Sequence, residues 1–75
     1  MSIEVVTGRI VSWVTKKGRA SFGLADVPGL DRAVRVSSGV VARRAALRRG
    51  DLVRLDLRRD GIGRPIAVAA SLLHR

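Results

Sequence analysis

Apolar and polar residues alternate along most of this chain, which is typical of β-strands rather than helices. The stretch from Val5 to Val14 is long and rich in β-branched residues, and Gly8 within it favours a bend or bulge. A second alternating stretch starts at Arg19 and ends before the Pro28-Gly29 turn. Its inward-facing residues are expected to be Ala20, Phe22 and Leu24, and its outward-facing residues Arg19, Ser21 and Gly23.

Three more strands follow along the chain. A short one places Val34 and Val36 inward and Arg35 and Ser37 outward. The fourth runs from Leu52 to Arg58, and the fifth runs from Pro65 to about Leu73 after a glycine-rich loop over 60–63. Between the third and fourth strands, Gly39 to Arg49 is the one candidate for a short helix, and its two arginine pairs make it marginal by itself.

A chain of 75 residues with five short strands predicts a single all-β domain. The expected architecture is a five-stranded antiparallel Greek-key barrel, closed or nearly closed, since closure removes exposed strand edges. The interior is expected to include several alanines and seven larger residues: Ile10, Phe22, Val34, Val36, Val53, Leu55 and Val68.

The charge of the chain is strongly positive. Fifteen basic residues, 13 of them arginine, against six acidic ones leave a net charge of +9. Such a domain attracts polyanions, and the planar guanidinium group suits phosphate. Residues 43–59 hold seven of the arginines, and Arg44 and Arg48 would share a helical face, where an intervening anion would relieve their repulsion. A solvated cationic loop, or a genome rich in GC, explains the same arginines without a ligand.

Catalysis and cofactor binding have little support. The chain has no cysteine, its one histidine is His74 near the C-terminus, and turn geometry or arginine neighbours account for Asp51, Asp56 and Asp60. We therefore expect no enzyme activity, metal site or cofactor. No apolar stretch approaches the roughly 20 residues that span a membrane, and no secretory signal is visible. A cytoplasmic location without membrane association is expected.

In Thr7–Trp13 a glycine leads into a basic and apolar run that ends in tryptophan, and Lys17-Gly18 follows it. These segments and three later ones together resemble cold-shock domains, which have the OB-fold. Thr7–Trp13 is similar to the family's opening strand, and Lys17-Gly18 to the start of its first ribonucleoprotein motif, Lys-Gly-Phe-Gly-Phe-Ile. Ala33–Ser38 resembles the second motif, Val-Phe-Val-His-Phe. Leu47–Val53 and Gly63–Leu72 resemble the segments that lead into the fourth strand and end the domain. The resemblance implies binding of unpaired bases on outward-facing aromatic residues.

Most of those aromatic residues are replaced in this chain. An alignment without gaps from Lys17-Gly18 puts Arg19 and Ser21 in the places of two phenylalanines, and Phe22 in that of the inward isoleucine. In the second motif, Arg35 and Ser37 replace a phenylalanine and the histidine. Binding is therefore expected to depend mainly on phosphates, with low sequence specificity. Trp13 has two interpretations, a surviving stacking residue or part of the core.

The leading hypothesis is a small protein that binds single-stranded RNA or DNA. Its candidate contact residues are Arg9, Trp13, Lys16, Lys17, Arg19, Arg35, Arg48 and Arg49. The alternative is a protein-interaction module that docks on an acidic protein or a ribonucleoprotein assembly.

Overall fold

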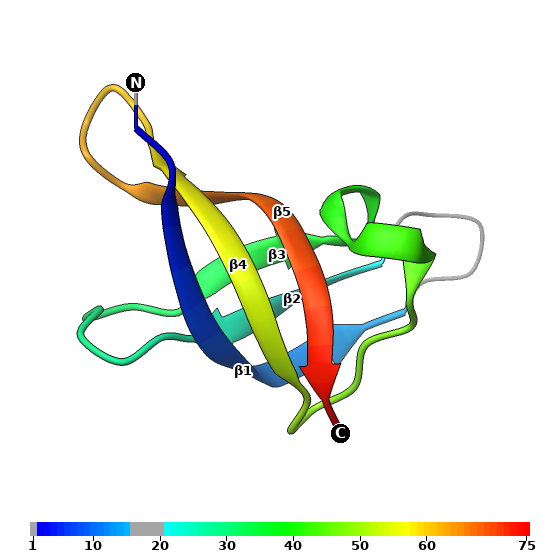
Figure 1. Cartoon of the computed structure of the whole chain (residues 1–75). Helices are drawn as coiled ribbons and strands as arrows, with labels where there is room; N and C mark the ends of the chain where they lie inside the picture. The colour runs from blue at the N-terminus through cyan, green and yellow to red at the C-terminus, as the bar shows by residue number, and fades with distance from the viewer. Residues whose placement is uncertain (1, 16–20) are drawn as a thin grey trace.

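A computed structural model describes residues 2–15 and 21–75. Five strands form one antiparallel sheet in the order β3-β2-β1-β4-β5 (Figure 1). They are β1 (Glu4–Val14), β2 (Phe22–Asp26), β3 (Val34–Ser37), β4 (Leu52–Arg59) and β5 (Pro65–His74). The expected all-β fold with five antiparallel strands is confirmed, and the sheet curls strongly into a half-barrel.

The long strand β1 makes the curl possible. Its first half pairs with β4, from Glu4 opposite Leu57 to Arg9 opposite Leu52. Its second half pairs with β2, and a bulge interrupts that pairing between Ile10 and Ser12. Because a bulge bends and twists a strand, β1 can belong to both halves of the curled sheet.

The two outer strands approach each other at the open side of the half-barrel. After β3 the chain passes through a short 3-10 turn over Ser38–Val40, and Val41 then forms a parallel bridge with Ala70 of β5. Val41 and Ala70 are both buried, with 5% and 1% of their surface exposed. This bridge ties the segment after β3 to β5 at one end, and among the described residues β3 and β5 themselves form no ladder.

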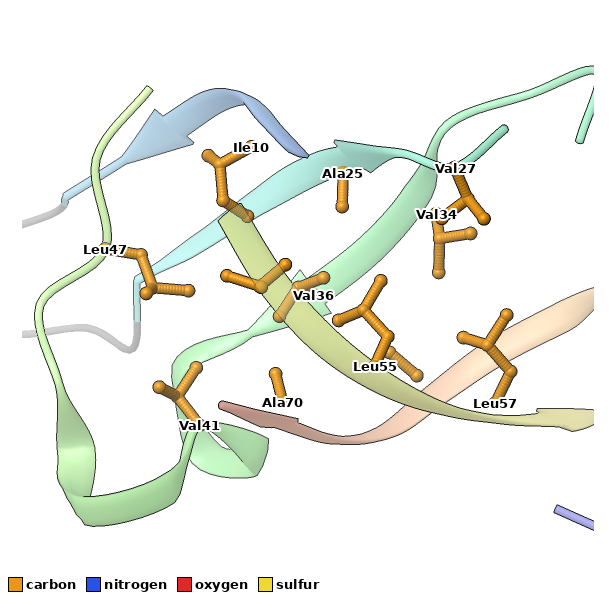
Figure 2. Close-up of a cluster of buried hydrophobic side chains, with 12 residues drawn as sticks. Ile10, Ala25, Val27, Val34, Val36, Val41, Leu47, Leu55, Leu57 and Ala70 are labelled. Carbon is orange, nitrogen blue, oxygen red and sulfur yellow. The ribbon is translucent and has the colours of Figure 1, made fainter. Parts of the chain in front are cut away.

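All five strands contribute to one core (Figure 2). The apolar side chains point into the interior of the curled sheet, and most are small or β-branched. The buried set is Ile10, Ala25, Val27, Val34, Val36, Val41, Leu47, Val53, Leu55, Leu57, Ala67 and Ala70. The expected interior positions of Ile10, Val34, Val36, Val53 and Leu55 are confirmed.

The predicted facing of β2 is wrong by one residue. Gly23 and Ala25 are buried, whereas Leu24 is 39% exposed and Phe22 is half-buried. Gly23 pairs with Val36 and Ala25 with Val34, and both of those valines point inward. Since directly paired residues share a face, a shift of one residue reverses every side chain of the strand. Phe22 and Leu24 therefore belong to the outer face.

The placement of Val68 in the core is also wrong. In β5, Ala67 pairs with Leu57 and Ala69 pairs with Asp56, so Val68 lies in a bulge between two paired residues. The bulge moves the inward positions to Ala67 and Ala70 and leaves Val68 36% exposed.

The candidate helix over 39–49 is replaced by two short 3-10 turns, η1 (Ser38–Val40) and η2 (Ala42–Arg44). Arg43 and Arg44 have positive φ angles of 57° and 49°, which a right-handed helix cannot contain. The bridge at Val41 also ties the segment to β5 in extended form. The expectation that Arg44 and Arg48 share a helical face is therefore wrong, and no anion is needed to relieve a repulsion there.

Candidate functional site

The outer face of β1, β2 and β3 carries a regular array of side chains. One row across the strands is Val14, Phe22 and Ser37, and the next is Ser12, Leu24 and Arg35. Paired residues of neighbouring strands point to the same side of a sheet, with their side chains close enough to contact one ligand. We call these six residues the platform.

Phe22 and Arg35 are in contact on the platform. The guanidinium carbon of Arg35 lies 4.6 Å from the centre of the Phe22 ring. This distance is within the range of a cation–π interaction, and it holds a positive charge directly over an aromatic surface. The sequence pattern assigned Phe22 to the core, so its place on this outer face was missed.

Apolar surface surrounds this contact. Val14 is 38% exposed and Leu24 is 39% exposed, each next to Phe22 on the same face. Ser12 and Ser37 add hydroxyl groups, and Arg35 is exposed. The platform therefore offers exposed apolar area with a cation and polar groups among it, an arrangement that suits the faces and edges of nucleobases.

Trp13 lies on the opposite side of the sheet from Phe22. It pairs with Gly23, is half-buried and packs against the core. A Cβ atom added to Gly23 would lie only 2.4 Å from Cε3 of Trp13, so the indole ring covers this glycine. Of the two interpretations of Trp13, the structure places its ring with the core rather than on the platform.

The side chain of Arg9, in β1, contacts the Arg48–Asp51 turn. The Arg9 guanidinium donates a hydrogen bond of 2.8 Å to the carbonyl oxygen of Gly50. The turn itself is fixed by Asp51, whose buried carboxylate accepts a 2.8 Å hydrogen bond from the backbone N–H of Arg48 and lies 3.6 Å from Nε of Arg75. Arg48 and Arg49 are exposed. Three of the predicted contact residues, Arg9, Arg48 and Arg49, therefore gather positive charge near the middle of β1.

The remaining predicted contact residues are Lys16, Lys17 and Arg19, and they lie outside the described residues, as does Ala20, which was expected to point inward. Arg35 is thus the predicted contact residue that belongs to the platform itself.

A groove lies at the end of the molecule away from the 3-10 turns. The loop between β2 and β3 and the loop between β4 and β5 form its walls, and both loops are at the same end in Figure 1. Its volume is about 650 Å³. Its charged side chains are Asp31, Arg32, Arg35, Arg59, Asp60 and Arg64. We call it the end groove; the sequence showed only isolated charges here, because two loops far apart in the chain form it.

Asp60 organises the β4–β5 loop. One carboxylate oxygen accepts backbone hydrogen bonds from Ile62 at 3.0 Å and Arg64 at 2.9 Å. The other accepts a 3.0 Å hydrogen bond from Nε of Arg64. The Arg64 backbone N–H is the main cause that lowers the pKa of Asp60, with help from the Ile62 N–H and the Arg64 guanidinium against partial desolvation.

Two kinds of site are absent from the part of the chain that is described. Across residues 2–15 and 21–75, no three His, Asp or Glu side chains gather so that they could hold a metal ion. The same residues form no helix with the length and apolar character needed to cross a membrane.

Comparison of the chain with models of protein families, with curated proteins and with solved structures finds no match. The geometry of the platform and the end groove is therefore the basis for proposing a function.

Proposed function

We propose that this protein binds single-stranded nucleic acid, RNA or DNA, on the platform formed by β1, β2 and β3. The observation that carries the proposal is the contact between Arg35 and Phe22 on the outer face of the sheet. The guanidinium carbon of Arg35 lies 4.6 Å from the centre of the Phe22 ring. An aromatic ring and a guanidinium plane each stack with bases, and the guanidinium also binds phosphate. The net charge of +9 supports the same ligand class.

The facing of β2 also changes how the chain compares with cold-shock domains. With Gly23 inward, we propose an alignment that inserts three residues after Lys17-Gly18 and matches Phe22-Gly23-Leu24-Ala25 to Phe-Gly-Phe-Ile of the family's first motif. In this alignment Phe22 occupies the position of the motif's first outward phenylalanine, and Leu24 occupies that of the second. The proposed platform therefore keeps one aromatic stacking residue in β2, where the ungapped alignment left none.

This arrangement predicts two contributions to binding. Phosphate contacts of the arginines weaken as salt rises, with log K falling by about 0.7 per phosphate neutralised on a single strand. Stacking on the Phe22–Arg35 pair contributes about 1–3 kcal/mol and is far less sensitive to salt. Few groups are available to read base edges, so sequence preference should be weak.

The proposal is tested with labelled oligonucleotides of about eight nucleotides, whose anisotropy is measured at low and at raised salt. Phe22→Ala should weaken binding roughly 5- to 150-fold, the equivalent of about 1–3 kcal/mol, at both salt concentrations. The matched control is Val5→Ala, which also truncates an exposed apolar residue of the sheet, 55% exposed, but outside the platform. Equal effects of the two variants, with both confirmed as folded, would contradict the proposal.

The alternative is docking on an acidic protein or a ribonucleoprotein assembly. It is favoured by Val14 and Leu24, since aliphatic side chains open to solvent are common at protein interfaces and less suited to stacking than aromatic rings. If no oligonucleotide binds even at low salt, this alternative takes precedence.

A further inference from the structure

The end groove combines positive charge with apolar surface. Its lining includes Leu30 and Pro65, both half-buried, and Ile66, which is 37% exposed. Ile62 adds a side chain that is 76% exposed. A ligand with an anionic backbone and aromatic rings, whose faces pack on apolar side chains, matches both kinds of surface.

The charges in the groove are unevenly paired. Asp60 is bound to Arg64, and Arg59 donates a 3.0 Å hydrogen bond to Gly63 and lies 3.9 Å from the Glu4 carboxylate. Within the described residues, neither Arg32 nor Arg35 takes part in an ion pair. Four arginines against two aspartates leave a formal excess of +2 in the groove lining, so an anion is the complementary occupant.

Arg35 joins the groove to the platform. Its side chain lines the end groove and a smaller crease of about 400 Å³ at the β3–β5 seam, which Ser37 and Ile66 also line. The same guanidinium covers the Phe22 ring. A continuous surface therefore runs from the platform across β3 and along the seam to the space between the two loops.

We infer that the end groove extends the proposed nucleic-acid site: a single strand that stacks on Phe22 crosses β3 at Arg35 and continues into the groove. Its next phosphates lie against Arg32 and Arg64, and its sugars and bases against Leu30 and Ile66. The inference rests on the proposed function. It adds the direction in which the nucleic acid leaves the platform, and it makes the binding site longer than the surface of β1, β2 and β3 alone.

Oligonucleotide length tests this inference. A strand of about three nucleotides covers the platform only, whereas one of about nine also reaches the groove. The double variant Arg32→Gln/Arg64→Gln should bind the long strand about tenfold more weakly than the wild-type protein and the short strand unchanged. Arg32→Gln alone, which leaves the Asp60–Arg64 pair intact, should show part of the same length-dependent loss. The salt slope for the long strand should also become flatter by about 0.7 for each phosphate that the variant no longer neutralises.

The matched control is Arg43→Gln/Arg44→Gln, which removes the same charge from the 3-10 turn η2. If this control weakens binding of the long oligonucleotide as much as Arg32→Gln/Arg64→Gln does, the effect is one of net charge and the inference is wrong. Equal losses for short and long strands would also overturn it. If the wild-type protein binds neither length, the proposed function itself fails; binding of a glutamate-rich peptide through the same arginines would then assign the groove to an acidic protein.

Discussion

The indole ring of Trp13 lies against Gly23 on the inner side of the sheet, where an added Cβ would be 2.4 Å from Cε3 of the ring and 2.2 Å from the carbonyl oxygen of Ser12. The glycine is required by this close approach. It also fixes the facing of β2, because the neighbours of an inward residue in a strand point outward.

Gly23→Ala should therefore destabilise the protein severely. Overpacking costs about 1–3 kcal/mol and more where backbone must move, and one of the two clashes is with backbone, so we expect at least about 3 kcal/mol. Gly39→Ala is the control, since an added Cβ there meets no atom within 4 Å. Urea unfolding of both variants measures the difference. Similar midpoints would mean that Trp13 does not cover Gly23.

A second prediction separates core from platform. Leu55 is fully buried, so Leu55→Ala should cost about 2–5 kcal/mol through lost transfer energy and a cavity. Phe22 is only half-buried, and Phe22→Ala should cost about 0.8–1.5 kcal/mol, half of what full burial of a phenylalanine contributes. Thermal unfolding of the two variants checks this order. A larger loss of stability for Phe22→Ala than for Leu55→Ala would mean that Phe22 belongs to the core.

Much of the fold could be predicted from the alternation of Val34 and Val36, and of Val53, Leu55 and Leu57, because large apolar residues occupied a single face there. In β2 the same rule failed. It puts the larger residues inside, but the space beneath Trp13 accepts only Gly23, so Phe22 and Leu24 face outward. Alternation also cannot show a bulge, and the one at Val68 reversed that residue's side.

The candidate site was only partly predictable for a related reason. Arg35 could be assigned to the outer face from its position between Val34 and Val36. Its contact with Phe22 depends on the pairing of β2 with β3, which is a tertiary property. The end groove likewise depends on two loops about 30 residues apart in the chain.

A third prediction concerns the backbone of η2. Arg43 has φ 57° and ψ 19°, a left-handed conformation that costs a non-glycine residue about 1–2 kcal/mol. Arg43→Gly should stabilise the protein by about 0.5–1 kcal/mol, because the relief exceeds the entropy that glycine adds to the unfolded chain. Ala42→Gly, at a neighbour without positive φ, should instead destabilise by about 0.5–1 kcal/mol. Chemical denaturation measures the change in the free energy of unfolding for each variant. Changes of the same sign would contradict the left-handed conformation of Arg43.

A fourth prediction follows from the lowered pKa of Asp60. A carboxylate whose pKa is lower in the folded than in the unfolded state stabilises the fold above its ordinary value of 3.8, and the contribution is lost as the pH falls through the lowered folded value. Asp60→Asn should thus have a lower melting temperature than the wild-type protein at neutral pH. The gap should narrow as the pH drops below about 4. A gap that is constant with pH would mean that the charge of Asp60 contributes nothing.

The most direct test of the central claim is a ¹⁵N–¹H NMR titration of the protein with a single-stranded oligonucleotide of about eight nucleotides. We expect the amide shifts to concentrate on the platform, at Ser12, Val14, Phe22, Leu24, Arg35 and Ser37, and to continue along the seam toward the end groove. The outer face of β1 and β4 around Val5 and Asp56, which pair with each other, should change little. Shifts spread evenly over the arginines of the surface, or centred on Val5 and Asp56, would contradict the claim that the Phe22–Arg35 face is the binding site.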